Sequence, residues 1–499
     1  MLLAMVTCAF QVSATDAGLA RRPWYEVSTA HFNFYSCGPI SGVYKLAGRL
    51  EQFSKAYSQL AGAQTVASPP IVVLVFPDHH SMEPFLPVYQ GQPATVSAFF
   101  QRGLDENLIV LALPEPGSPS MNLEVIFHEY THFLFRRNDE VWPLWLKEGM
   151  AEMYSTFATA GHYASIGSPI ERHLRLLASQ PLMPLTELFS ATQDSPDYNE
   201  QQRQGIFYAE SWLLTHYLMA GDNAQYVARF GQFNTLLRQG QLPTQAFTNA
   251  LQAPLPLVEE QLRRYLARGQ FRPIDLLVGT NLSAPVATQV HPVTPAEVCF
   301  RLGDELLRIG SLDEAKPYFL QAQELAPASP LPEEGLGLLA ERRAQPDEAL
   351  QNLKAAIERG SDSFLVFYIY AREKYRATAD SDGRHRRLEG SLAAEIRDAL
   401  QRSIVLMPDF APAHELLGFF EMVQGDNLAV AEQQLRAAIQ LAPENRSYLI
   451  SLAQLQMLNQ NPEAARQTLQ PLLLPNVAME LRKEAETIMT QLAEPKSTQ

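Results

Sequence analysis

Two histidines one helical turn apart are the residues of this chain whose types and spacing most directly indicate chemistry. They lie in the segment His128-Glu129-Tyr130-Thr131-His132. On an α-helix, residues i and i+4 share a face, so both imidazoles could reach one metal ion. Glu129 would lie beside a water molecule on that ion and could act as a general base. The competing interpretation is a pair of helical histidines, on the surface or in the core, that bind no ligand.

A carboxylate 16 positions after His132 could complete the three protein ligands that a catalytic zinc uses. It belongs to the segment Trp145-Leu146-Lys147-Glu148-Gly149-Met150-Ala151-Glu152. In these two segments the chain resembles the gluzincin metallopeptidases, and most of all the peptidase MA-like families, which often carry tetratricopeptide repeats. The resemblance implies that Glu148 is the third ligand of a single Zn²⁺ ion per chain. Two imidazoles and a carboxylate suit zinc, although these ligands alone do not exclude other metals.

The same resemblance implies roles for two further residues. Glu152 lies one turn after Glu148 and would accept the second N–H of a ligating histidine, which fixes its tautomer. The two glutamates could also exchange these roles, or both could lie on a solvated helix face. Gluzincins stabilise the oxyanion with a tyrosine or histidine from a later helix, and we assign that role to Tyr208, with Tyr198 and His216 as alternatives.

The elements that must position these residues alternate between strands and helices. Continuous or alternating apolar runs predict strands, and apolar residues at helical spacing predict helices. Strands are expected at 24–28, 31–35, 71–76 and 108–113, and helices at 43–60, 119–137, 144–157, 170–177, 205–218 and 258–267. Together with the resemblance, they predict an α+β fold whose first part is a zincin-like peptidase domain over residues 22–271, a mixed sheet followed by helices.

A repeated pattern of small and apolar residues follows. Leu302 and Gly303 recur 34 residues later as Leu336 and Gly337. That period is typical of the tetratricopeptide repeat, a helix pair whose small residues let neighbouring helices approach closely. Such arrays form a concave surface, so we expect a protein partner there.

The domain boundaries follow from these patterns. The proline-rich stretch 272–295 is expected to be a linker, because its prolines would interrupt a helix. The repeats are expected to form an all-α solenoid of about five units over 296–480. Residues 481–499 would be the end of a C-terminal helix and a tail.

Composition and charge exclude some function classes. The net charge is −15, and no cluster of Lys and Arg indicates a nucleic-acid partner. Residues 1–17 contain a short apolar run that ends in small residues, which predicts a signal peptide and export to the periplasm or the extracellular space; an ordinary buried terminus is the alternative. The run is too short to span a membrane. A lipid anchor on Cys8 is not expected, because the residues before it lack the small residue that such anchors require.

The sequence therefore predicts zinc-dependent hydrolysis of a peptide or protein substrate, with Glu129 as general base and the repeats recruiting substrate or partner. An alternative from another class is a protein-interaction scaffold whose metal site is vestigial or structural. A metal hydrolase that acts on non-peptide bonds is a third interpretation. The base beside an open ligand position favours an enzyme over a structural zinc site.

Overall fold

The chain divides into two compact units. The computed structural model describes residues 18–61, 71–89, 92–94, 96–114, 123–135, 142–192, 205–221, 225–278, 288–475 and 477–493. The first unit comprises the described residues within Met1–Glu51, Ala67–Met121 and Pro285–Asn427, and the second those within Gln52–Val66, Asn122–Ala284 and Leu428–Gln499. The predicted signal peptide, 1–17, lies outside the described residues.

A mixed six-stranded sheet forms the start of the first unit, as the sequence predicts. Its strand order is β11-β1-β2-β3-β7-β6. Strands β2, β3 and β7 are parallel, and the others pair antiparallel. All six residues of β3 are buried, which explains its continuous apolar sequence. The bounds are β1 (Trp24–Ser28), β2 (Phe32–Ser36), β3 (Ile71–Phe76), β6 (Ala98–Gln101), β7 (Leu108–Ala112) and β11 (Gln289–Val293).

Short elements and one long helix connect these strands. Helix α2 (Ile40–Ala61) contributes residues to both units. The remaining elements are α3 (His79–Met82), the 3₁₀ helix η1 (Glu83–Phe85), and the paired strands β4 (Val88–Tyr89) and β5 (Gln92–Pro93).

Part of the segment expected to be a linker, 272–295, forms strands. Strand β10 (Ile274–Leu277) pairs with β9 (Tyr163–Ile166) in the second unit, and β11 pairs with β1 in the first. Pro292 fits β11 because this strand lies at the edge of the sheet, where a missing N–H interrupts no ladder. Prolines argue against a helix here, but they do not prevent an edge strand.

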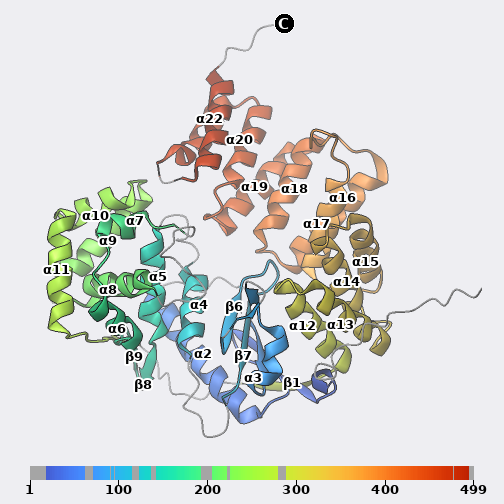
Figure 1. The fold of residues 1–499 in the computed structure, drawn as a ribbon. Helices are drawn as coiled ribbons and strands as arrows, with labels where there is room; N and C mark the ends of the chain where they lie inside the picture. Colours follow the sequence, from blue (N-terminus) through green and yellow to red (C-terminus); the bar gives the residue numbers. More distant parts are fainter. Residues whose placement is uncertain are drawn as a thin grey trace, which may run out of the picture. The chain divides into compact units, whose positions relative to one another are not determined.

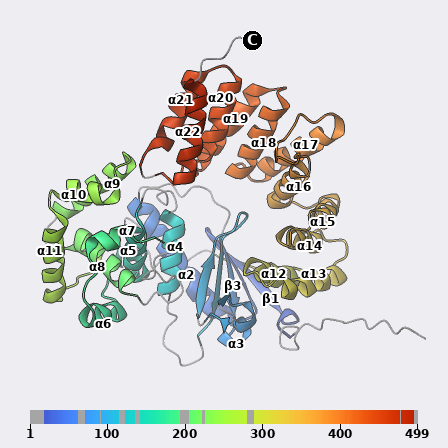
Figure 2. The same cartoon turned by 45° about the horizontal axis from the view of Figure 1, so that its top comes forward.

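Successive helices, most of them in antiparallel pairs, follow the sheet in the first unit (Figures 1 and 2). They are α12 (Pro295–Arg308), α13 (Leu312–Leu325), α14 (Leu331–Arg342), α15 (Pro346–Glu358), α16 (Phe364–Arg376), α17 (Gly390–Leu406) and α18 (Ala411–Gln424). The repeated glycines lie where partner helices meet. A Cβ on Gly303 would lie 2.8 Å from Phe319, and one on Gly337 would lie 2.7 Å from Leu353. The 34-residue period therefore reflects helix packing.

The second unit is mainly helical and is built around α8. The helices from its first part of the chain are α4 (Glu124–Phe135), α5 (Leu144–Ser155), α6 (Glu171–Ser179), α7 (Leu185–Ser190), α8 (Ile206–Ala220), α9 (Gln225–Arg238), α10 (Pro243–Leu251) and α11 (Leu255–Arg268). Strands β8 (Ala158–Ala160), β9 and β10 form a small antiparallel sheet. Every residue of α8 from Phe207 to Leu218 is buried, and α5, α6, α9 and α11 pack around it (Figure 1).

The last helices of the chain also belong to the second unit. They are α19 (Leu428–Leu441), α20 (Tyr448–Leu458), α21 (Pro462–Leu469), the 3₁₀ helix η3 (Gln470–Leu473) and α22 (Met479–Ala493). The region predicted to be repeats is therefore helical throughout its described part. Among the described residues, no helix is both long and apolar enough to cross a membrane. The finer assignment of 22–271 to a zincin-like peptidase domain stays a prediction.

Candidate metal centre

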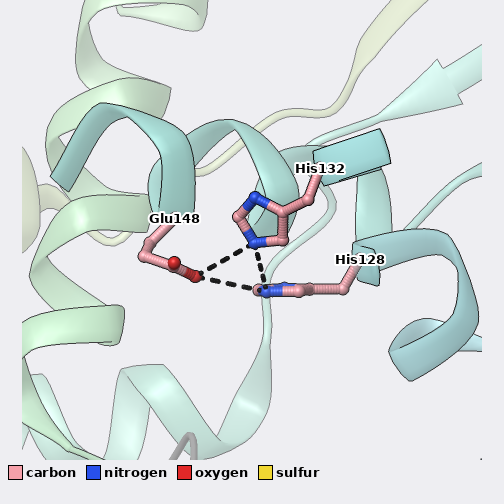
Figure 3. Close-up of side chains that lie close together, drawn as sticks. All are labelled: His128, His132 and Glu148. Atoms are coloured by element: carbon pink, nitrogen blue, oxygen red, sulfur yellow. Dashed lines mark hydrogen bonds and ion pairs between the residues drawn. The ribbon is translucent and has the colours of Figure 1, made fainter. Parts of the chain in front are cut away.

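Helix α4 places two histidines on one face. The opposite side of the helix is fixed by aromatic packing, because Phe127 stacks on Phe53 of α2 with 4.7 Å between ring centroids. With that rotation set, His128 and His132 project from the other face, and their Nε2 atoms lie 3.1 Å apart (Figure 3). His128 is buried, and the side chain of His132 is partly exposed.

Helix α5 brings a carboxylate to the same point. The Oε2 atom of Glu148 lies 3.3 Å from Nε2 of His128 and 3.3 Å from Nε2 of His132. Figure 3 shows the three side chains pointing toward one another from α4 and α5. Among the described residues, these three form the group of His, Cys, Asp and Glu side chains that could hold a metal ion. The structure thus brings together the three residues that the sequence assigns as ligands.

Gly149 allows α5 to reach this position. A Cβ on Gly149 would lie 2.1 Å from Oγ1 of Thr215 and 2.4 Å from the carbonyl oxygen of Ser211, both in α8. Helices α5 and α8 can approach this closely only where one of them has no side chain. The glycine after Glu148 therefore has a packing role that sets where the carboxylate lies.

The distances within the cluster fit a tetrahedral zinc site. With bonds of about 2.0–2.1 Å, neighbouring ligand atoms of such a site lie about 3.3–3.4 Å apart. The three distances here are 3.1, 3.3 and 3.3 Å. Nδ1 of His128 lies 3.3 Å from Oε1 of Glu152, so a proton on Nδ1 would leave the lone pair of Nε2 facing Glu148. Converging lone pairs repel unless a cation or a proton lies between them.

Electrostatics keep Glu148 ionised. Burial raises the pKa of its carboxyl group, but the charges and hydrogen bonds of His132 and His128 outweigh burial and lower the pKa to about 2. At neutral pH the cluster therefore offers a carboxylate rather than a carboxylic acid, and a carboxylate is the form that binds a metal.

Glu152 lies behind His128, where the resemblance expects it. Its Oε1 atom is 3.3 Å from Nδ1 of His128, and its side chain is fully buried. Its other oxygen, Oε2, lies 3.1 Å from Nη2 of Arg172 and 3.1 Å from Nε2 of His173. Burial raises the pKa of Glu152, but its contacts with His128 and His173 outweigh burial and lower it. Glu152 is thus a carboxylate that can orient the ring of His128.

Sequence reasoning did not find Arg172 and His173. Both lie on α6, and Arg172 also reaches outward, with Nη1 2.8 Å from Oε2 of Glu124 at the start of α4. Arg172 thus pairs with both Glu124 and Glu152, and these two ion pairs link α6 to α4 and α5. The neighbouring Arg172 and His173 on an otherwise amphipathic helix carry no spacing signal that would link them to Glu152, 20 residues before Arg172.

Glu129 and Tyr208, the two predicted catalytic residues, lie on α4 and α8. Glu129 is half-buried and follows His128 on α4. Tyr208 lies on α8, and its ring centroid is 6.5 Å from that of His128. Tyr208 is almost fully buried, as expected for a residue of the central helix. Both catalytic assignments stay predictions.

The structure describes one of the two alternatives to Tyr208. Tyr198 lies outside the described residues. His216 is buried on α8, and its Nδ1 atom is 2.7 Å from the hydroxyl oxygen of Tyr265. Burial lowers the pKa of His216 to about 4, so this histidine is neutral at pH 7. Its contact with Tyr265 gives it a structural role.

One helix pair of the first unit matches a known family. Residues 296–329, which hold α12 and α13, match the tetratricopeptide repeat family. The chain therefore contains a tetratricopeptide repeat, and the predicted solenoid of about five units extends that finding to later helices. No curated protein is significantly similar to this chain.

Some solved structures are locally similar. YrrB, described as a tetratricopeptide protein with an unusual peptide-binding site, shares 16% identity over 38% of this chain and 92% of its own, with a TM-score of 0.32. TTC0263, a thermophilic tetratricopeptide protein from Thermus thermophilus, shares 20% sequence identity, and the match covers 39% of this chain and 99% of TTC0263, with a TM-score of 0.29. MamA from Desulfovibrio magneticus RS-1 shares 17% sequence identity, and the match covers 38% of this chain and 95% of the MamA chain, with a TM-score of 0.30. TM-scores this low support no conclusion about the function of this chain.

Proposed function

We propose that His128, His132 and Glu148 hold one zinc ion and that the chain hydrolyses peptide bonds. One observation carries the proposal. Two imidazole nitrogens and a carboxylate oxygen converge with separations of 3.1–3.3 Å, which fit the edges of a tetrahedral zinc site. Three protein ligands leave the fourth position open, as in catalytic rather than structural zinc sites.

The remaining residues would each do one task. When bound, zinc supplies an acidified water molecule and polarises the scissile carbonyl group. Glu129 takes the proton of the attacking water and later gives it to the leaving amine. Glu152 holds His128 in the tautomer whose Nε2 carries the lone pair. Tyr208 would donate a hydrogen bond to the oxyanion. Export, suggested by residues 1–17, would place the reaction outside the cytoplasm.

A second candidate rests on the matched repeat. Tetratricopeptide helices present surfaces that bind proteins, and the family match at 296–329 supports this role more directly than any comparison supports hydrolysis. In that case the chain is an interaction scaffold, and the metal centre is structural or inactive. The two candidates predict different behaviour of Glu129.

The distinguishing experiment measures bound zinc and cleavage in parallel. Wild type and Glu129→Gln are purified, their zinc content per chain is determined, and both are incubated with a peptide library and a panel of esters. The exposed Glu171→Gln on α6 is the matched control. We expect one zinc in each protein and loss of peptide cleavage by about 10²- to 10⁴-fold in Glu129→Gln only. A zinc-loaded wild type that cleaves nothing would support the scaffold, and cleavage of esters alone would indicate a different hydrolase.

A further inference from the structure

A cavity of about 500 Å³ lies within the first unit. One wall is the turn between β6 and β7, residues 101–105, and the other is formed by α12, α14 and α16. The three helices come from successive helix pairs (Figure 2). Sites for small ligands and peptide side chains have this order of volume. Because the sheet supplies one wall, the cavity is more than a groove of the repeats.

Apolar side chains line both walls. Leu104, at the tip of the turn, is 54% exposed. On the helical side, Leu338 is half-buried, and Leu365 and Ile369 are buried behind it. An exposed leucine opposite an apolar wall leaves room for an apolar side chain between them, and burial of that side chain would be favourable.

The charges around the cavity are mostly paired. Arg308 lies 2.8 Å from Asp304 and 2.9 Å from Asp105, and Arg372 lies 2.6 Å from Glu341. These two arginines therefore have carboxylates of their own.

One arginine at the rim differs. Arg342 is exposed at the end of α14 and has no hydrogen-bond or ion-pair partner among the described residues. The other arginines that line the cavity are Arg102, Arg308 and Arg372. An incoming carboxylate would find an unpaired partner here.

We propose that this cavity binds an extended peptide segment that carries an apolar side chain next to a carboxylate. The apolar side chain packs between Leu104 and Leu338, and the carboxylate pairs with Arg342. None of His128, His132 and Glu148 lines the cavity, so binding there can be measured in a variant without hydrolysis.

The test uses the full chain with Glu129→Gln, so that probes stay intact. Three fluorescein-labelled octapeptides of Gly and Ser are used, and they carry Leu-Glu, Ser-Glu or Leu-Lys at their centre. Binding is followed by fluorescence anisotropy of the labelled peptide as the protein is titrated up to millimolar concentration. We expect Leu-Glu to bind at least about fivefold more tightly than the other two, because each of those lacks one of the two contacts.

Two variants locate the binding. Arg342→Glu should reverse the charge preference, so that Leu-Lys binds more tightly than Leu-Glu. Leu104→Ser should weaken both peptides. Arg384→Glu, an exposed arginine in the loop after α16, is the control and should change neither. Circular dichroism confirms folding, and Arg342 is exposed, so its reversal should leave the fold intact. Absence of binding, equal binding of Leu-Glu and Ser-Glu, or an unchanged preference in Arg342→Glu would each overturn the proposal.

Discussion

Two clusters of charged side chains, one in each unit, satisfy their carboxylates in different ways. In the first unit, the arginine cluster joins Arg301 and Arg308 to Asp105, Glu106 and Asp304. Arg308 lies 2.9 Å from Asp105 and 2.8 Å from Asp304, and Arg301 lies 3.1 Å from Glu106. In the second unit, the histidine cluster joins Glu148 to two imidazole nitrogens whose lone pairs converge on it.

The difference distinguishes a structural ion-pair network from a candidate metal site. A buried carboxylate must be compensated by a cation or by hydrogen bonds. The arginine cluster contains its own permanent cations, because a guanidinium does not deprotonate in proteins. The histidine cluster has no permanent cation at its centre. We propose that zinc from solution supplies the missing cation, and the predictions below test that contrast.

The largest expected effect is in the arginine cluster. Arg308→Met would leave Asp105 and Asp304 without their main partner, and we expect the free energy of unfolding to fall by about 3–5 kcal/mol. Urea unfolding with zinc and with a chelator should give the same loss. The exposed Arg342→Met serves as control, with a change within about 0.5 kcal/mol. A loss that depended on zinc would break the contrast between the clusters.

The next effect concerns the packing that positions Glu148. Gly149→Ala would force α5 away from Ser211 and Thr215, and we expect destabilisation by about 1–3 kcal/mol together with weaker zinc binding. Gly231→Ala, in α9, is the matched control, because nothing lies within 4 Å of its added Cβ. That control should be neutral or up to about 1 kcal/mol more stable. Equal effects of the two substitutions would argue against the close approach of α5 and α8.

A smaller effect, on zinc affinity, is expected for Glu152, which contacts His128 on the side away from Glu148. Glu152→Gln removes the charge that orients His128, and zinc affinity should fall by about 10- to 100-fold in a competition titration with a chromophoric chelator. Glu148→Gln, which removes a ligand, should lower zinc affinity more than Glu152→Gln does. The exposed Glu171→Gln should leave affinity unchanged. If Glu152→Gln cost more than Glu148→Gln, the two glutamates would have exchanged roles.

The smallest effect is a pH dependence in the first unit, where His31 and Glu51 form a pair 2.7 Å apart. The hydrogen bond with Glu51 raises the pKa of His31, so its contribution is present below about pH 6.5 and is lost as pH rises through the raised value. Burial raises the pKa of Glu51, but hydrogen bonds from His31 and Thr29 outweigh burial and lower it. Its contribution is therefore present above about pH 4.5 and is lost as pH falls.

Both contributions coexist between about pH 4.5 and 6.5. Glu51→Gln should therefore cost about 1 kcal/mol near pH 5.5, and the cost should shrink toward pH 8 and toward pH 3. Urea unfolding at these three pH values is the measurement. Glu83→Gln tests a more exposed pair, with His80 at 3.4 Å, and should show a weaker dependence. A cost for Glu51→Gln that was constant with pH would contradict the account.

Much of the fold and the shared face of His128 and His132 could be predicted from the sequence because both depend on short-range periodicity. The helical spacing of His128 and His132 and the apolar run of β3 each specify a local structure. Gly303 and Gly337 recur because each lets two helices touch. These features can be read along the chain without knowledge of distant contacts.

Other features depend on contacts that spacing does not encode. Pro292 suggests a linker, yet it lies in an edge strand that pairs with residues near the start of the chain. Arg172 and His173 reach the site only because α6 packs against α8, and α5 packs against the same helix. The packing role of Gly149 appears only once α8 is in place. Long-range packing decides such positions, and no local pattern precedes it.

The most direct test of the central claim is zinc X-ray absorption on the loaded protein. The account predicts one zinc per chain with two imidazole nitrogens and oxygen ligands at about 2.0–2.1 Å, and loss of one imidazole in His132→Ala. No bound zinc, or a spectrum that His132→Ala leaves unchanged, would contradict the assignment of His128, His132 and Glu148 as a metal centre.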